Sequence, residues 1–470
     1  MRCYMGKTFY AIVVFVSSFS WVFAQEKVLS LENTLDIIRQ YHPVAKQSIL
    51  LVDMAEANLQ ASRGAFDPSF YSRNERKTFD GRNYYNYSNP ELKIPTWFGI
   101  NVKAGFENNQ GDKINPEITP NRSTYVGVSF PVLKGLLLDQ RRAVLQQSKL
   151  MVQKSRQEQL LMINDLLFEA ADVYWKWVSA YQIYIVLTNA VSINEKRFEF
   201  VKLAYQSGDR AAIDTTEALS QLQAIQTTQS QAWAELQKQR LYLSNYMWSE
   251  SGDPYELLED VTPEPAWNMV EIRSYPMPDL DQTVTVASTL HPKLLALNFK
   301  QSVLEVERRL KFQSLLPTLD LKYNFLNQGY TTPKFFTQPL LENNYRFGIQ
   351  FGLPLFQREA RGEYRAAKIK ITDLGYTQQQ TQLEIINKVK ATYNDLLATQ
   401  AQVLLYQSNV NNLQRLLKAE EEKFSIGESS MFLVNSRETK LLESQQKLAE
   451  LKAKFYTKIL AVQWASGQVR

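Results

Sequence analysis

Cysteine and histidine are almost absent from this sequence. Its 470 residues contain one cysteine, Cys3, and two histidines. The chain can therefore form no internal disulfide and has few ligands for a transition metal. Beyond residue 24 it has neither a Gly-Lys-Ser/Thr phosphate-binding loop nor a Gly-x-Ser-x-Gly nucleophile elbow. We expect no enzyme, no cofactor and no metal site.

Long apolar runs are also missing beyond residue 24, so no helix there is expected to span a membrane. This does not exclude transmembrane β-strands, which need only about 9–11 alternating residues. Charge of one sign is not in excess either. Without Arg2 and Lys7 the chain has 51 basic and 48 acidic residues, and no basic block. Nucleic acid is therefore not expected as a partner.

Residues 1–24 have the pattern of a secretory signal peptide. A basic start at Arg2 and Lys7 is followed by apolar residues 8–23 and by a small-residue cleavage site that ends at Ala24. The alternative is a single membrane anchor that is not cleaved. Serines interrupt the apolar run, which favours cleavage.

The rest of the sequence is duplicated. A His-Pro pair and a later proline recur at a spacing of 249 residues, and a strand-ending proline and a turn glycine recur at 223 and 219 residues. In chain order these landmarks are His42, Pro43, Pro68, Pro131 and Gly208, then His291, Pro292, Pro317, Pro354 and Gly427. Such a repeat indicates a pseudo-symmetric architecture. We assign the histidines and prolines a structural role at helix turns and element boundaries.

Both units have the same order of expected elements, in which a helix leads to strands and then to a very long helix. We predict a first repeat, a linker and a second repeat at 25–250, 251–281 and 282–470. The strands are expected at about 66–131 and about 317–353, and the long helices at about 136–206 and about 355–425. Each long helix has about 71 residues and a length of roughly 105 Å, so we expect a coiled-coil-like assembly.

The expected strands of the second repeat alternate cleanly. In 345–353 the odd positions are apolar and the even positions are polar or glycine, and 318–326 behaves in the same way. The first repeat has three strand-like runs, at 69–79, 97–107 and 124–130. One interpretation is a half-buried sheet in a soluble protein. The other is a barrel wall that is apolar towards lipid. The role of 97–107 stays open.

Taken together, these features resemble the TolC family of outer-membrane efflux ducts. The segments that carry the resemblance are the strand exits Ser129-Phe130-Pro131-Val132-Leu133-Lys134-Gly135 and Gly352-Leu353-Pro354-Leu355-Phe356, each followed by arginines, and the glycine turns. The resemblance covers nearly all of the chain after the signal. It implies a mixed α+β membrane protein, mainly α, with a tandem repeat of helix–strand–strand–long helix–helix. It further implies a homotrimer, whose chains each give four strands to a 12-strand transmembrane β-barrel above a long periplasmic α-helical barrel.

The function implied by this resemblance is transport. The chain would be the outer-membrane channel of a tripartite efflux or type I secretion system in a Gram-negative cell, through which substrates pass passively. Its partners would be a periplasmic adaptor (membrane fusion) protein, an inner-membrane pump and outer-membrane lipid. The competing interpretation is a soluble periplasmic coiled-coil scaffold protein. The sequence indicates neither the substrate nor the pump class.

In the resembled family the tunnel closes near the turns of the helix hairpins. The first repeat carries the family's pattern of tyrosine, arginine and acidic residues there, and the gate candidates are Tyr205, Arg210, Asp214 and Glu217. The second repeat departs from it, with Phe424, Ser429, Leu433 and Ser436. Alternatively, the two acids only complement a helix N-terminus. The candidates for docking an adaptor are the turn residues Gly208, Asp209, Gly427 and Glu428.

Overall fold

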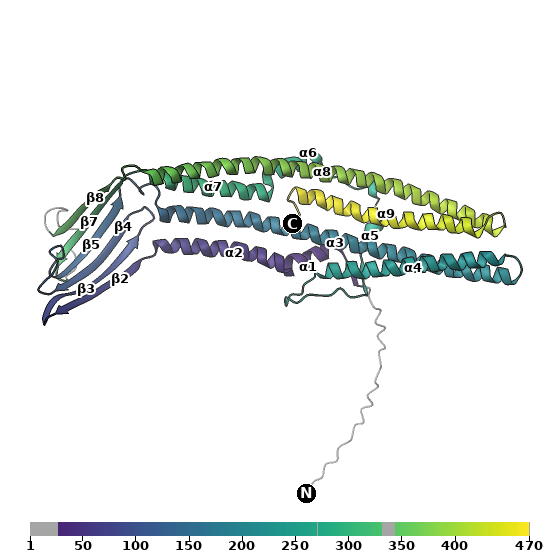
Figure 1. Cartoon of the computed structure of the whole chain (residues 1–470), viewed down its shortest axis with the longest axis horizontal. Coiled ribbons are helices and arrows are strands. Elements are labelled where there is room, and N and C mark those ends of the chain that lie inside the picture. Colours follow the sequence, from purple (N-terminus) through teal and green to yellow (C-terminus); the bar gives the residue numbers. More distant parts are fainter. Residues whose placement is uncertain (1–26, 270, 331–343, 470) are drawn as a thin grey trace, which may run out of the picture.

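The computed structural model describes residues 27–269, 271–330 and 344–469, which form a long bundle of helices with a sheet at one end (Figure 1). The expected signal peptide lies outside these residues. The α-helices are α1 (Leu31–Tyr41), α2 (Pro43–Arg63), α3 (Gln140–Gln206), α4 (Ala212–Ser244), α5 (Ala266–Met269), α6 (Leu280–Leu290), α7 (Pro292–Gln313), α8 (Arg358–Ser425) and α9 (Met431–Ala465). In the described ranges, none of them has an apolar stretch sufficient to cross a membrane.

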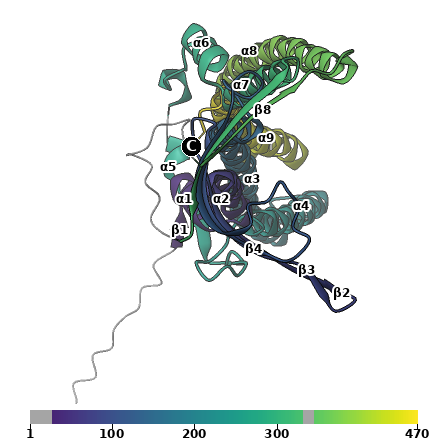
Figure 2. The same ribbon diagram turned by 90° about the vertical axis from the view of Figure 1, so that its left-hand side faces the viewer.

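The strands fall into two sheets. A small parallel pair joins β1 (Lys27–Leu29) to β6 (Val261–Pro263). The large sheet is antiparallel throughout, in the order β2-β3-β4-β5-β7-β8. Its strands are β2 (Ser69–Phe79), β3 (Arg82–Pro95), β4 (Asn101–Gln110), β5 (Asn121–Pro131), β7 (Thr318–Gln328) and β8 (Tyr345–Gly352). Seen from the sheet end, the sheet is a curved arc with β8 and β2 at its two ends (Figure 2).

The number of strands corrects the sequence prediction. Four strands per chain were expected, but the sheet of the described residues has six. The strand that was missed is β3, and β4 covers most of the strand-like run 97–107, whose role was open. The alternation that identifies a strand is weak in β3 because Tyr84 and Tyr85 are adjacent and Pro90 interrupts the run. Trp97 lies in the turn between the two strands.

The helices that precede the sheet are each broken at a histidine. His42 separates α1 from α2, and its Nδ1 accepts a hydrogen bond from the Val44 N–H at 3.2 Å. His291 does the same between α6 and α7, accepting from the Lys293 N–H at 3.1 Å. In both cases a proline follows as the first helical residue, where its missing N–H costs nothing. Burial lowers the pKa of both histidines, which keeps the imidazoles neutral and able to accept.

Two long helices give the bundle its length. Short helices run along each of them: α2 and α4 lie along α3, and α7 and α9 along α8 (Figure 1). Contacts of α3 with α7 and with α9 join the two halves. The sheet is therefore at one end of the bundle, and the α3–α4 and α8–α9 turns are together at the other (Figure 1).

The largest buried cluster lies midway along the helices. Trp177 and Phe455 are almost completely buried there, and Trp175 stacks on Tyr456 with ring centroids 4.6 Å apart. The inter-repeat linker packs on this cluster. Its regular elements are β6, α5 and the 3₁₀ turn Ile272–Ser274. Because the linker shares this buried cluster with residues of both repeats, it helps to hold their middle sections together.

Candidate membrane wall and helix-tip site

One face of the six-stranded sheet carries an unbroken apolar row. The strand register pairs one apolar side chain from each strand with the next across the whole sheet. In sheet order the row is Phe70, Leu92, Ala104, Val126, Phe325 and Tyr345. Closer to the helices the face continues with exposed Phe347, Ile349 and Phe351 on β8. So much exposed apolar surface is unusual for a water-soluble sheet and suits contact with lipid.

The opposite face of the sheet is polar. Lys103, Lys322 and Gln350 lie on this face, and Lys322 donates a hydrogen bond to Gln350 Oε1 at 3.2 Å. Tyr125 of β5 reaches across the neighbouring strand β4, and its hydroxyl donates a hydrogen bond to the Glu91 carboxylate of β3 at 2.6 Å. One apolar and one polar face is the arrangement of a wall between lipid and an aqueous lumen.

The turns at the far end of the helices are built in the same way in both repeats. Gly208 and Gly427 adopt φ values of +84° and +82°, in the left-handed region that favours glycine. The following N–H, of Asp209 or Glu428, bonds back to a carbonyl five residues earlier, at 2.8 and 2.9 Å. This is the Schellman ending of a helix. The candidate adaptor-docking residues therefore lie at the two tips.

The tips are packed against each other. Val201 of α3, Ala218 of α4, Phe424 of α8 and the residues Met431 and Val434 of α9 form one buried cluster. Each of the four helices contributes to it. The ends of the two hairpins are therefore one packed unit within a chain.

The predicted gate residues of the first repeat do not form one cluster. Arg210 reaches the other hairpin, where its guanidinium lies 4.1 Å from the centre of the Phe424 ring and donates to the Phe424 carbonyl. Asp214 lies in the first turn of α4, and Tyr205 is 48% exposed. Within the described residues, no hydrogen bond or ion pair joins Arg210 to Asp214 or Glu217. Whether these residues gate a channel stays a prediction.

A buried ion-pair network near the tips was missed by the sequence analysis. Arg197 of α3 donates to Glu438 of α9 at 2.8 Å and to Glu421 of α8 at 2.7 Å. Glu438 is only 4% exposed and also accepts from Asn194 at 3.0 Å. The partners are 224 and 241 residues from Arg197. No local pattern could have revealed this, because charged residues on long helices normally face solvent.

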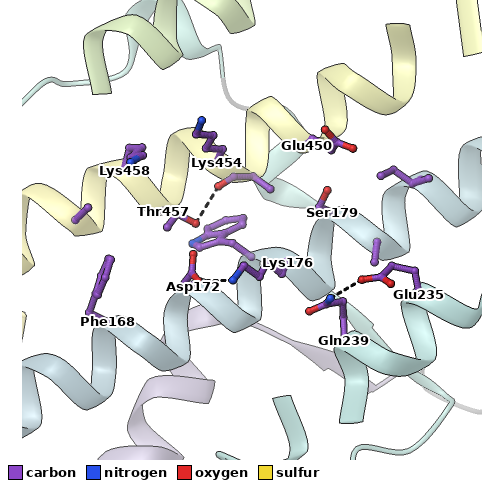
Figure 3. Close-up of a pocket in the computed structure, with 15 residues that line it drawn as sticks. Phe168, Asp172, Lys176, Ser179, Glu235, Gln239, Glu450, Lys454, Thr457 and Lys458 are labelled. Carbon is purple, nitrogen blue, oxygen red and sulfur yellow. Dashed lines mark hydrogen bonds and ion pairs between the residues drawn. The ribbon is translucent and has the colours of Figure 1, made fainter. Parts of the chain in front are cut away.

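A groove of about 580 Å³ lies between α3, α4 and α9 (Figure 3). Two of its lysines form ion pairs: Lys176 pairs with Asp172 on the same helix at 2.7 Å, and Lys458 pairs with Asp395 of α8 at 2.7 Å. Glu235 accepts from Gln239 at 2.6 Å. In the described residues, no group of three or more histidine, cysteine and acidic side chains is placed to hold a metal ion.

Comparison with known proteins agrees with this geometry. Residues 285–468 match the family model of the outer membrane efflux proteins. The whole chain is similar to the outer-membrane channel OprN, with 13% identity, a TM-score of 0.66 and coverage of 93% of this chain and 90% of that one. It is also similar to the Campylobacter jejuni outer membrane channel CmeC, with 14% identity, a TM-score of 0.64 and coverage of 100% and 94%. For the open state of the Neisseria gonorrhoeae channel MtrE the values are 11%, 0.60, 92% and 88%. No protein of curated function matches the sequence.

Proposed function

We propose, from the premise that this chain is an outer-membrane efflux protein of the TolC type, that three copies form one continuous duct across the outer membrane and the periplasm. The premise fixes the location, with the sheet in the outer membrane and the helices in the periplasm. The observation that carries the proposal is the apolar row that crosses the whole sheet. A curved sheet with two unpaired edges is stable in lipid only when further strands close it.

The proposed duct is the exit of a larger transport system. In this proposal substrates pass through the duct passively, and an inner-membrane pump delivers them to it. The proposed link to the pump is a periplasmic adaptor protein that docks on the helix tips. The tips are suited to this because they are the part of the chain farthest from the sheet (Figure 1). A photo-crosslinking residue at Asp209 or Glu428 is expected to capture the adaptor in cells. Capture of other copies of this chain alone would contradict the docking proposal.

A gate at the tips is part of the same proposal. Asp214 and Glu217 are half-buried at the start of α4, and three copies would place six carboxylates around the end of the tunnel. Replacing both by alanine is expected to reduce cation preference and block by multivalent cations in planar bilayers. Unchanged selectivity and block would leave the acids as ordinary residues of a helix N-terminus.

The direct test of the duct compares neighbouring positions on opposite faces of β8. Ile349→Asp places a charge on the apolar face, and Gln350→Asp places the same charge on the polar face. We expect Ile349→Asp to be lost from outer-membrane fractions and Gln350→Asp to insert normally. The wild-type protein should have the mass of three chains after detergent extraction. A soluble single chain that tolerates both substitutions equally would instead support the periplasmic scaffold.

A further inference from the structure

We propose that the groove between α3, α4 and α9 is a ligand-binding site on the tunnel side of the duct, one in each chain (Figure 3). Its ligand is an amphipathic anion, a molecule with a flat apolar body and one sulfonate or carboxylate group. This rests on the trimeric duct proposed above, and it assigns to that duct a class of cargo with a site of its own.

The groove lies on the side of the helices that faces away from the linker and β1. On α9, the Tyr456 hydroxyl donates to the Trp267 carbonyl of the linker at 2.8 Å. On α3, the Tyr174 hydroxyl donates to a carbonyl of β1 at 2.9 Å. The groove residues Lys454 and Asp172 are each two positions from these tyrosines. Two positions are about 200° around a helix, so the groove is on the opposite side.

That opposite side is the inner side of the arc. Seen from the sheet end, β1, α5 and α6 lie on the convex side, whereas α4 and α9 lie on the concave side (Figure 2). Three copies that close around the concave side therefore turn three grooves towards the tunnel. Asp172 is about midway along α3, roughly 50 Å from each end of the helix. The site is thus well separated from the helix tips.

The walls of the groove suit a flat apolar molecule of small size. Phe168, Trp175 and Ile183 of α3 line it together with Ala461 of α9. Its volume of about 580 Å³ lies in the range of roughly 300–1,000 Å³ that is usual for small-molecule pockets. Aromatic walls of this kind offer a large contact area to a ring system.

The charges of the groove leave one positive charge unbalanced. All three acids that line it, and two of its three lysines, lie in ion pairs. The pairs are Asp172–Lys176, Glu235–Lys238, Glu450–Lys447 and Lys458–Asp395. The remaining lysine, Lys454, is exposed and has no ion pair with any residue that the structure describes. A negatively charged group beside Lys454 restores the balance, which selects an anion over a cation.

Two buried polar atoms of the groove also need a partner. Within the described part of the chain, neither the Trp175 Nε1–H donor nor the Gln239 Oε1 acceptor has one. Trp175 is only 6% exposed, and the Gln239 amide is oriented by its bond to Glu235 at 2.6 Å. Buried polar atoms are nearly always paired. A ligand that carries an acceptor and a donor on its apolar body supplies both partners.

Labelling of a cysteine in the groove tests the proposal. Thr457→Cys lines the groove, and its only background is Cys3 in the expected signal peptide. The rate of maleimide labelling would be measured on the trimer in lipid nanodiscs at rising concentrations of 8-anilino-1-naphthalenesulfonate. This probe has apolar rings, an anionic group and an N–H donor. The matched probe, N-phenyl-1-naphthylamine, has the same rings and N–H without the sulfonate.

We expect the sulfonate to slow labelling by half at a concentration about fivefold lower than the uncharged amine. Lys454→Glu should abolish this difference, because it reverses the unbalanced charge. The control is Lys440→Glu, which should preserve the difference. Lys440 is exposed on the same helix and lies outside the groove, two heptads nearer the tips on nearly the same side.

Three results would overturn the anion site and leave the duct intact. They are a trimer whose cysteine neither probe protects, equal protection by the two probes, and equal effects of Lys454→Glu and Lys440→Glu. A protein that purifies as a single soluble chain would instead overturn the proposed function itself. The two failures are therefore distinguishable.

Discussion

Removing the Arg197 guanidinium should destabilise the helix tips strongly. The guanidinium pairs with Glu438, and the two side chains are only 13% and 6% exposed. In Arg197→Met, Glu438 keeps its bond from Asn194 but is otherwise a buried charge without a counter-ion. Breaking a buried pair on one side costs about 3–5 kcal/mol. We expect Arg197→Met to lower the free energy of unfolding by about 3 kcal/mol.

Urea unfolding in detergent, followed by far-ultraviolet circular dichroism, measures this change. The matched control is Arg156→Met, on the same helix, because the pair of Arg156 with Glu56 is 51% exposed on both sides. Its loss should cost less than about 1 kcal/mol. The double variant Arg197→Met/Glu438→Leu should recover most of the stability, since it leaves no buried charge. Equal effects of Arg197→Met and Arg156→Met would refute the argument.

Three further predictions follow from single sites. The pKa of His291 is lowered to about 4, mainly by burial, so the unfolded chain takes up a proton first as the pH falls below 6.5. The free energy of unfolding should therefore decrease by about 3 kcal/mol between pH 6.5 and 4. The variant His291→Asn keeps a side chain that can cap the helix. Thermal unfolding at a series of pH values should show no such decrease for this variant. Gly105→Ala should displace Tyr125, whose hydroxyl would lie 2.8 Å from the added Cβ, and so reduce the amount of protein in outer-membrane fractions. Normal insertion would show that the Tyr125–Glu91 hydrogen bond is not needed for the sheet. Gly208→Ala should cost about 1 kcal/mol because its φ is positive, although the added methyl group would meet no other atom. Gly362→Ala, in the second turn of α8, should instead gain up to about 1 kcal/mol, and urea unfolding measures both changes.

The sequence predicted the fold where the chain uses local signals. The His-Pro pairs at His42 and His291 each form a helix cap from residues only two positions apart. The cap is therefore visible as a short motif, and its recurrence revealed the duplication. The clean alternation of β8 and the long proline-free run of α8 are also local. The match of residues 285–468 to the efflux family and the TolC-like fold confirm the resemblance built on these signals.

The rest depended on distant contacts. The strand β3 lacks a clean alternation because Tyr84 and Tyr85 are adjacent and Pro90 interrupts the run. Its partners are distant, as when Glu91 accepts from Tyr125, 34 residues away. Arg197 and Glu438 look like ordinary surface charges until the two hairpins are packed together. Arg210 was found as a candidate from the family pattern. Its contact with Phe424 crosses the two repeats and was not visible in the pattern of either one.

The uneven division of the six strands between the repeats creates a mismatch of widths. Strands lie about 4.8 Å apart, so the first repeat, from β2 to β5, is roughly 14 Å wide, and the second, from β7 to β8, only about 5 Å. Each stands on two neighbouring helices, which pack roughly 8–10 Å apart. The connections must therefore converge below the first repeat and spread below the second. Unusual backbone occurs in both connections, with φ +86° at Gly135 and +50° at Gln357. Gly135 lies between β5 and α3, and Gln357 lies between β8 and α8. The chain therefore changes direction at these two residues, where it passes from the uneven spacing of the strands to the regular spacing of the helices.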